Sequence, residues 1–541
     1  MLQHASDRPL VPATAQRLEG EVNEIRAIYD RLYPQHALTL VLLQGDDPIW
    51  GAPEVFEGPV SLGPQHVPGR FLGIVRRPGP RPDAAEVTVV LSVPRPPTEG
   101  EIRHAEAPWQ PVRPLAPIFR MQPILYEDIR YRFEMRRKAK APARHAHRPL
   151  PFGKGVAILS PDLPQPPADR PRPAILIGVH WLEVGGAENL AFDCAAWAVE
   201  AGLRVFVVAS TPSLQRLAHR LPGGDDVQFI RLDRYLPPKL WPRFVERLVT
   251  QENIRLVHIH HCAPLYDSLP QLRVFAPQVQ VIDSTHIVEY ADGGYPRMSG
   301  VWSNFIDIHH VISTGLVDYF RDRFGILHNV RLGRMIERHD DPAALPRPNL
   351  TPGQKTLHVA FIGRLYYQKR PVVLALTLRA LDRWARANGV ELTASIVGEG
   401  PFAPAVARLL ARFGLRERVT MLPGNADVPA LLGRSDILLL PSNNEGLALV
   451  CYEAIRHGCI PVGTDVGAQS EIVPADLLVP LAPRRTVRET VRRVRRLWQD
   501  AAFLDRQHAA MRAAWSRIAA DPTAREVLMP IYEQAARQAR D

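Results

Sequence analysis

The stretch that decides the fold is residues 437–458, which read ILLLPSNNEGLALVCYEAIRHG. Its first four residues form an uninterrupted apolar run, which is typical of a strand buried on both faces of a parallel sheet. A helix is expected to follow and to end near His457, because Gly458 suits the position after a helix C-terminus. Glu445 then lies in the loop and Glu453 in the helix, near the carboxyl edge where open α/β sheets bind ligands.

Two carboxylates that face a cleft can accept hydrogen bonds from several hydroxyls, which suits a sugar or a ribose. Taken alone, the pair is more simply explained as a solvated loop glutamate and a glutamate on a helix surface, because buried unpaired carboxylates are rare. The rest of the chain has to decide between these interpretations.

Alternating strands and helices extend outward from this stretch. Buried apolar runs begin at residue 174, and the alternation restarts after a linker at 329–354. Such alternation predicts parallel sheets with right-handed crossovers. We therefore expect an α/β fold with two tandem doubly wound, Rossmann-like domains. The expected strands are 174–179, 205–209, 256–259, 279–282 and 311–313 in the first domain, and 357–362, 392–397, 419–422, 437–440 and 460–463 in the second.

The 541 residues are too many for a single core. Residues 1–150 are expected to be an extra α/β region of unknown role, with a helix at 15–33 and strands at 37–43 and 87–91. The domains that follow are expected at 172–330 and 355–520, with a final helix within 521–541.

The net charge of +10 favours anionic partners such as nucleotides or phospholipid surfaces, although a generally arginine-rich proteome explains it equally well. The basic segment 130–148 is interpreted as a solvated linker in preference to a membrane contact. No apolar run reaches the ~18 residues of a membrane-spanning helix. Four cysteines without C-x-x-C spacing indicate buried reduced thiols. We expect a cytoplasmic protein, with any membrane contact peripheral, at the inner face of the plasma membrane.

Two cations flank the loop after the first strand of the second domain. Residues 363–371 read GRLYYQKRP, and Pro371 suits the first turn of a helix. Arg364 and Lys369 can clamp a diphosphate, the guanidinium bidentately and the ammonium as a point charge. In the first domain, paired glycines at 185–186 allow backbone N–H groups to approach an anion at a helix N-terminus.

Other activities find weaker support. Residues 398–403 match the dinucleotide pattern G-x-G-x-x-A, but no acidic residue follows the next strand and Pro401 removes an N–H group, so a dehydrogenase is disfavoured. His258 and His260 share one face of a strand, but no acidic partner lies near them in sequence. We therefore expect no metal site. The P-loop and nucleophile-elbow patterns are absent from the sequence.

The ordered set of motifs resembles the retaining, nucleotide-sugar-dependent glycosyltransferases of family 4 (glycosyl transferases group 1), which have the GT-B fold. The resemblance covers about 172–525, and its most diagnostic part is the E-x7-E pair. Residues 1–150 have no counterpart, and the usual Lys-Gly is Lys369-Arg370 here. The segments are GGAE at 185–188, GRL at 363–365 with the lysine at 369, VGEGP at 397–401, EGLAL at 445–449 with the glutamate at 453, and GTDVGAQSEIV at 463–473.

The resemblance implies a role for each matching residue. Arg364 and Lys369 would hold the donor diphosphate and neutralise its charge as it leaves. Glu445 would bind the donor sugar hydroxyls, and Glu453 those of the ribose. His286 falls where the family often has a cleft histidine near the reacting sugar. The remaining expected donor-binding positions are Gly186, Gly363, Gly398, Gly446, Leu447, Ala448 and Leu449. The C-terminal helix within 521–541 would cross back to the first domain.

The expected function is a metal-independent hexosyltransferase without a cofactor. It would move a sugar from a nucleotide-sugar donor to a saccharide or lipid-linked acceptor hydroxyl, with retention, in polysaccharide or glycolipid biosynthesis. No nucleic acid partner is expected. A basic face on the helix expected at 484–496 would allow contact with an anionic membrane, although a packed helix with a wet arginine face is preferred. The alternatives are another GT-B activity, such as a phosphorylase, for which nothing marks a pyridoxal-phosphate lysine, and a catalytically silent GT-B scaffold that binds sugar nucleotides.

Overall fold

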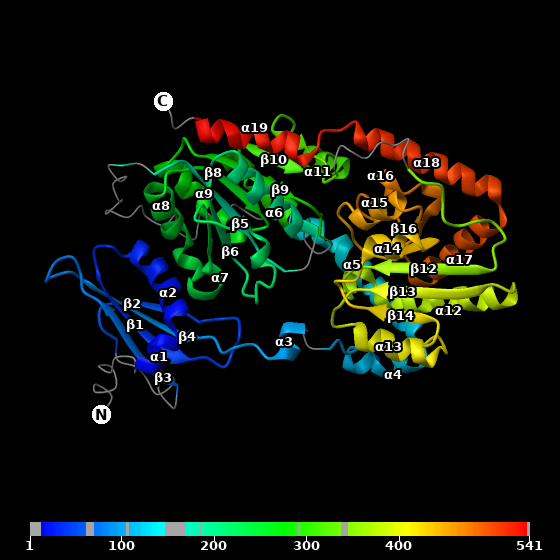
Figure 1. Ribbon diagram of the computed structural model, residues 1–541, viewed down its shortest axis with the longest axis horizontal. Helices are drawn as coiled ribbons and strands as arrows, with labels where there is room; N and C mark the ends of the chain where they lie inside the picture. The colour runs from blue at the N-terminus through cyan, green and yellow to red at the C-terminus, as the bar shows by residue number, and fades with distance from the viewer. Residues whose placement is uncertain are drawn as a thin grey trace.

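The computed structural model describes residues 12–60, 70–103, 108–145, 169, 171–183, 186–289, 293–336 and 345–537. Two parallel sheets form the two halves of the molecule, and a smaller mixed sheet lies beside the first half (Figure 1). The expectation of two doubly wound α/β domains with an additional N-terminal α/β region is confirmed.

The first domain is built on a seven-stranded parallel sheet of order β11-β10-β9-β8-β5-β6-β7. Its interior strand β5 is buried at every residue, as its unbroken apolar sequence predicts. The strands are β5 Ala174–Val179, β6 Arg204–Ala209, β7 Val227–Ile230, β8 Ile254–His260, β9 Gln280–Thr285, β10 Ile308–Val311 and β11 Val330–Leu332. The helices are α6 Gly186–Glu200, α7 Leu232–Tyr235, α8 Trp241–Gln251, α9 Ala263–Phe275, α10 Gly294–Val301 and α11 Thr314–Phe324.

Two expectations for this sheet are wrong. The strand expected at 311–313 lies at 308–311, because His309 and His310 are buried within it and behave as core residues. The segment expected to be a linker begins with an edge strand, β11, which pairs in parallel with β10.

The second domain has a six-stranded parallel sheet of order β14-β13-β12-β15-β16-β17. Its strands are β12 Thr356–Ile362, β13 Glu391–Val397, β14 Val419–Leu422, β15 Ile437–Leu440, β16 Ile460–Thr464 and β17 Leu478–Val479. Its helices are α12 Pro371–Ala387, α13 Ala403–Arg412, α14 Val428–Gly433, α15 Leu449–Arg456, α16 Gln469–Ile472 and α17 Pro483–Gln499. The residues at 437–458 thus form strand, loop and helix as their pattern predicts.

The last two helices, α18 Ala501–Ala519 and α19 Ala524–Arg537, run along the second half and then the first (Figure 1). Helix α19 packs against α6, and Tyr532 Oη lies 2.6 Å from Nδ1 of His258 on β8. Where the chain passes between the halves, the buried Arg334 guanidinium forms ion pairs with Glu471 of α16 and, at 2.8 Å, with Asp521.

The N-terminal region begins as a compact α/β layer on the first domain. Its sheet has the order β2-β4-β1-β3, and helix α2 packs against α8. Tyr29 Oη donates a hydrogen bond of 2.9 Å to the carbonyl of Tyr235, and Arg31 pairs with Glu252 at 2.7 Å. The elements are α1 Pro12–Arg17, α2 Glu19–Leu32, β1 Ala37–Gln44, β2 Glu54–Glu57, β3 Phe71–Arg77, β4 Glu86–Val93 and α3 Glu99–Arg103.

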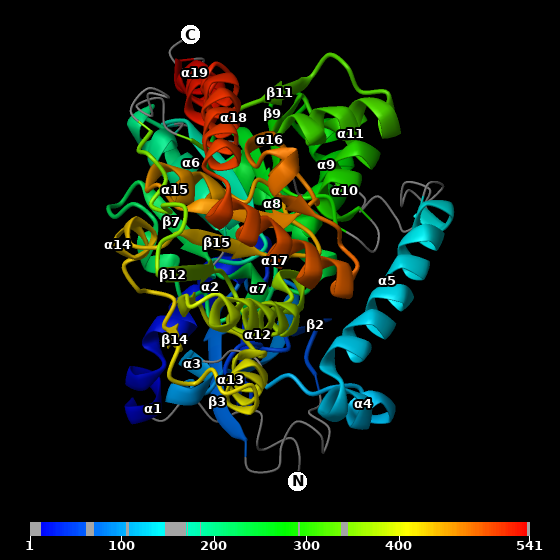
Figure 2. The same cartoon turned by 90° about the vertical axis from the view of Figure 1, so that its right-hand side faces the viewer.

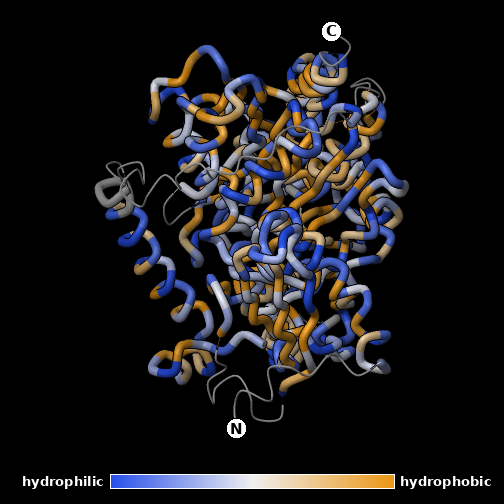
Figure 3. Tube along the Cα trace, turned by 90° about the vertical axis from the view of Figure 1, so that its left-hand side faces the viewer, coloured by the Kyte–Doolittle hydropathy of each residue, from blue (hydrophilic) through white to orange (hydrophobic). Residues whose placement is uncertain are grey.

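The chain then reaches the second domain through α4 Ala116–Met121 and α5 Pro123–His145. Helix α5 stands at the side of the molecule and is largely hydrophilic (Figures 2 and 3). Residues 130–145, interpreted as part of a solvated linker, are helical, so the linker is wrong for them, although most of the side chains at 132–140 are exposed to solvent; the remainder of 130–148 lies outside the described residues. Among the described residues, no helix combines the length and the apolar character needed to cross a membrane.

Candidate active site

The expected lysine and glutamate meet at the carboxyl edge of the second sheet. Lys369 comes from the loop after β12 and Glu445 from the loop after β15, and these two strands are parallel neighbours. Lys369 Nζ donates to Oε1 of Glu445 at 2.6 Å, with 17% and 5% of their side chains exposed. Because the pair is largely shielded from water, the attraction is stronger than that of a surface ion pair.

Backbone contacts hold these loops together. The N–H group of Asn443 donates to the carbonyl of Gln368 at 2.8 Å, and the Gln368 side-chain amide donates to the carbonyl of Asn444 at 3.0 Å. Gly398 has a φ of +131°, and a Cβ there would lie 2.2 Å from the carbonyl oxygen of Gly363. Only glycine fits this position, so the two expected glycines serve the close packing of neighbouring loops.

The first domain contacts the glutamate loop directly. A Cβ on Gly446 would lie 2.3 Å from the backbone carbonyl oxygen of His286, which follows β9. The side-chain amide of Asn444 donates to the carbonyl of Val288 at 2.9 Å. The structure therefore brings His286 and the Glu445 loop together across the interface between the domains.

His286 is buried, and neither ring nitrogen has a hydrogen-bond partner among the described residues. Burial lowers the pKa of the ring to about 3, with smaller contributions from His310 and His180. His286 is therefore neutral at physiological pH. Its unpartnered nitrogens are available to exchange a hydrogen bond with a ligand hydroxyl.

The charge of Arg364 acts on two groups of the first domain, His180 and Glu188. Burial, with a smaller contribution from the positive charge of Arg364, lowers the pKa of His180 to about 4. Burial raises the pKa of Glu188, and Arg364 partly opposes this shift. Trp181 Nε1 donates to Glu188 at 2.9 Å. Sequence reasoning assigned no role to His180, Trp181 or Glu188, although the first two directly follow the carboxyl end of β5 and Glu188 lies in the first turn of α6.

The remaining expected residues lie at the start of two helices. Leu447 and Ala448 are buried before α15, Ala448 has a φ of +48°, and Leu449 begins the helix. Gly186 is the first residue of α6 and has open space around it, whereas its neighbour Gly185 lies outside the described residues.

Glu453 is placed differently from Glu445. It lies on the exposed side of α15, yet desolvation raises the pKa of its carboxyl, with Arg456 and His457 opposing. The two glutamates of the E-x7-E pair therefore occupy distinct environments: Glu445 is buried and ion-paired with Lys369, whereas Glu453 lies near solvent.

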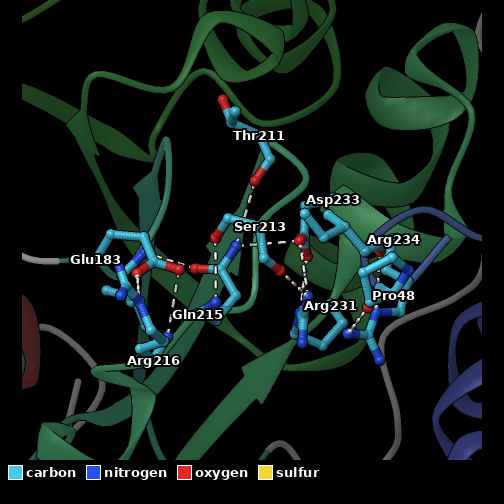
Figure 4. Close-up of polar contacts among 11 residues, drawn as sticks. Pro48, Glu183, Thr211, Ser213, Gln215, Arg216, Arg231, Asp233 and Arg234 are labelled. Atoms are coloured by element: carbon cyan, nitrogen blue, oxygen red, sulfur yellow. Dashed lines mark hydrogen bonds and ion pairs between the residues drawn. The ribbon is translucent and has the colours of Figure 1, made fainter. Parts of the chain in front are cut away.

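A network of buried polar side chains fixes the loops after β5 and β6 (Figure 4). The Gln215 side chain accepts a hydrogen bond from the N–H of Leu182 at 2.5 Å and donates to Asp233 at 3.0 Å. Arg216 Nε pairs with Glu183 at 2.5 Å. Residues 182 and 183 after β5 are thereby held in place.

The histidines on β8 are buried. Among the described residues, Cys194, His258 and His260 form a buried group whose potential ligand atoms lie within 4.8 Å of one another. His258 already places Nδ1 against Tyr532 Oη, at 2.6 Å, and Nε2 against Ser284 Oγ, at 2.8 Å. Hydrogen bonding therefore accounts for both nitrogens of the central histidine, and the absence of a metal stays a prediction.

Family models match both halves of this arrangement. The model "Glycosyltransferase Family 4" matches residues 184–332, and "Glycosyl transferases group 1" matches 356–500. The chain belongs to the GT-B glycosyltransferases. The expected resemblance to this class is confirmed, and the N-terminal region lies outside both matches.

Two relatives illustrate the similarity of this GT-B glycosyltransferase to known proteins. D-inositol 3-phosphate glycosyltransferase from Salinispora tropica is 30% identical over 209 residues, which cover 36% of this chain and 42% of the relative. The phosphatidylinositol N-acetylglucosaminyltransferase gpi3 subunit from Schizosaccharomyces pombe is 23% identical over 310 residues, which cover 54% and 66%. The chain thus spans less than two thirds of the length of each relative.

Solved structures show the same fold. Sucrose-phosphate synthase from Thermosynechococcus elongatus matches with a TM-score of 0.51 and 19% identity, covering 68% of this chain and 99% of its own. A glycosyltransferase from Rickettsia africae matches with a TM-score of 0.50 and 16% identity, covering 67% and 99%. At these identities the likeness concerns the fold alone.

Proposed function

We propose that this protein transfers a hexosyl group from a nucleotide-sugar donor to an acceptor hydroxyl with retention of anomeric configuration, as a family 4 enzyme. The observation that carries the proposal is the ion pair of Lys369 with Glu445 at the carboxyl edge of the second sheet, together with the charge of Arg364, which helps to lower the pKa of His180 in the first domain. A cation to bind phosphate and a carboxylate to bind hydroxyls are thereby fixed against each other. These are the two recognition elements that a sugar diphosphate requires.

In the proposed mechanism, Arg364 and Lys369 bind the donor diphosphate. Negative charge grows on this group as the bond to the anomeric carbon breaks, so fixed cations stabilise the transition state more than the ground state. The N–H groups before α15, from Gly446 to Leu449, add the favourable end of a helix dipole. No metal is needed for this charge neutralisation.

The carboxylates and His286 orient the sugar and the nucleoside. Glu445 accepts hydrogen bonds from sugar hydroxyls while its bond to Lys369 ties the sugar position to the phosphate position. Glu453 binds the ribose hydroxyls. Neutral His286 bonds a sugar hydroxyl beside the reacting carbon. Retention follows if the acceptor hydroxyl attacks from the face that the diphosphate leaves, with a phosphate oxygen taking the proton.

The acceptor is proposed to be a saccharide or a lipid-linked alcohol, in polysaccharide or glycolipid biosynthesis. Both relatives carry names that specify an inositol-containing acceptor, an inositol phosphate and a phosphatidylinositol. Inositol phosphates and phosphatidylinositol are therefore the first acceptors to examine.

The test measures release of nucleoside diphosphate from UDP-N-acetylglucosamine, UDP-glucose, GDP-mannose and ADP-glucose, with and without these acceptors. We expect turnover with at least one donor, and a fall in kcat of about 10²–10³ for Lys369→Ala, the size typical for one lost electrostatic contact. Glu445→Gln keeps the shape but removes the charge and should also be impaired. Nuclear magnetic resonance of the product reports its anomeric configuration.

Matched controls come from the exposed face of α17, where Arg488 and Arg492 have 71% of their side chains exposed. Arg488→Ala should retain wild-type turnover. Nucleotide binding without turnover of any donor, together with unchanged behaviour of Glu445→Ala, would instead support a catalytically silent sugar-nucleotide-binding scaffold.

We also propose a cytoplasmic location with peripheral contact to anionic membranes. Val494 of α17 is buried, so this helix turns its apolar side to the protein and its arginines to solvent. Such contact is electrostatic and should weaken with salt. Sedimentation with vesicles containing phosphatidylglycerol should retain the protein at low salt, and an equal distribution with neutral and anionic vesicles would contradict this.

A further inference from the structure

Helix α5 belongs to the N-terminal region, outside both family matches, yet its first half packs against α12 and α17 of the second domain (Figure 2). Its approach is anchored by Trp109, whose indole stacks on the Phe402 ring with centroids 4.4 Å apart. The N–H of Trp109 also donates to the carbonyl of Pro401 at 2.8 Å. The helix is thereby attached beside the loop that carries Lys369.

One contact from α5 reaches that loop through an aromatic ring. The guanidinium carbon of Arg130 lies 3.8 Å from the centroid of the Tyr367 ring, and only 18% of the Arg130 side chain is exposed. A cation over a ring in a poorly solvated site is strongly attracted to it. Tyr367 begins the short 3₁₀ turn that ends at Lys369, so this contact acts within two residues of the phosphate-binding ammonium.

A second contact concerns Arg370, where the family usually has glycine. Arg370 is buried and has a φ of +50°, a backbone conformation that glycine adopts without cost and other residues do not. Its guanidinium donates to the carbonyl of Pro441 at 3.4 Å. Glu127 of α5 is buried as well, and although burial raises the pKa of its carboxyl, the charges of Arg130 and Arg370 oppose that rise.

The charges of helix α5 and of the loop after β12 are therefore complementary. Arg370 and Glu127 line the same small cavity, so the buried positive charge of Arg370 lies near a carboxylate that α5 supplies. Arg130 lies 3.7 Å from the same carboxylate, which orients its guanidinium over Tyr367. The turn from Tyr367 to Arg370 is thus contacted by Arg130 at its first residue and shares a cavity with Glu127 at its last.

We propose that α5 is a structural part of the donor site, in which Glu127 and Arg130 are positioning residues for the turn Tyr367–Arg370 and hence for Lys369 Nζ. The accessory region contributes in this way to donor binding without touching the donor. The activity readout rests on the function proposed above, and the structural readout does not.

The structural readout is hydrogen–deuterium exchange of peptides covering 363–372. We expect faster exchange in this segment for Arg130→Ala and Glu127→Gln, with β12 unchanged. Arg484→Ala is the matched control, because it breaks the ion pair of α17 with Asp128 of α5 and leaves the turn alone. Unchanged exchange of 363–372 in both Arg130→Ala and Glu127→Gln would overturn the proposal. If Arg130→Ala does not fold, Arg130→Met, which keeps the apolar stem, takes its place.

The activity readout uses whichever donor of the panel above the wild type turns over. We expect Arg130→Ala to raise KM for this donor and lower kcat/KM by about tenfold, the order expected for a desolvated cation–π contact. The acceptor KM should stay unchanged, and Arg130→Lys should recover part of the loss. Equal changes in donor and acceptor KM would overturn the positioning role. Faster exchange of 363–372 with no turnover of any donor by the wild type would sustain the positioning role and refute the proposed function.

Discussion

Replacing Gly446 by alanine tests whether contact between the two domains sets the geometry of the site. A Cβ at this position would lie 2.3 Å from the backbone carbonyl oxygen of His286, closer than real Cβ atoms approach other atoms. The neighbouring atom belongs to backbone, so it cannot rotate away as a flexible side chain would. The loop after β9 and the loop after β15 must therefore separate.

The separation needed is ~1 Å, and a misplacement of that size costs on the order of 10²-fold in rate when it alters the alignment of reacting groups. We expect Gly446→Ala to lower kcat/KM by about this factor. The free energy of unfolding should change little, because the strain is relieved by moving the domains apart and no apolar group is exposed.

The assay is release of nucleoside diphosphate, measured beside urea unfolding. Gly433→Ala is the matched control, since a Cβ at Gly433 meets nothing within 4 Å and the same atoms are added. Wild-type kcat/KM in Gly446→Ala would refute the reasoning, since the contact would then be absent in the reacting conformation. A large loss of stability would also refute it, since the contact would then belong to the fold.

Three further outcomes are expected. Activity should survive dialysis against EDTA, because Arg364 and Lys369 supply the charge, and loss of activity that zinc or magnesium restores would contradict this. Folding stability should fall as the pH drops below ~6.5, because histidines of the unfolded chain take up protons there. Burial holds the pKa of His286 at about 3 and that of His310 at about 4, so each residue lowers the free energy of unfolding by about 2 kcal/mol between pH 8 and pH 5. Urea midpoints that do not shift over this range would exclude this effect. Arg334→Ala should cost roughly 3 kcal/mol by leaving its two carboxylates unpaired, whereas Arg321→Ala, which breaks exposed pairs, should cost less than about 1 kcal/mol.

The parallel strands could be predicted because their signal is local. β5, β12 and β15 are apolar at nearly every position, which is the pattern of strands covered on both faces. The edge strands β7 and β11 were missed because they are short and alternate with polar residues. The boundary of β10 was wrong because histidines, which count as polar in a pattern, are buried core residues there.

The site was partly accessible to the same reasoning. Arg364, Lys369 and Glu445 could be proposed because each directly follows a predicted strand, and parallel strands end at one edge. The ion pair of Lys369 with Glu445 could not, because it joins residues 76 positions apart through side chains. Helix α5 was misjudged for a related reason: Glu127 and Arg130 bury charge against charge and against a ring, a form of packing that leaves no apolar periodicity.

The bond between Tyr532 and His258 has a consequence for how the chain acquires its structure. It connects positions 274 residues apart, and helix α19 covers α6 of a domain whose own strands are complete some 190 residues earlier in synthesis. Loop closure over such a span is slow compared with local helix formation. The first domain therefore emerges with part of its apolar surface uncovered, and its final packing must wait for the last helix. Molecules interrupted before α19 are the ones we expect chaperones and proteases to encounter.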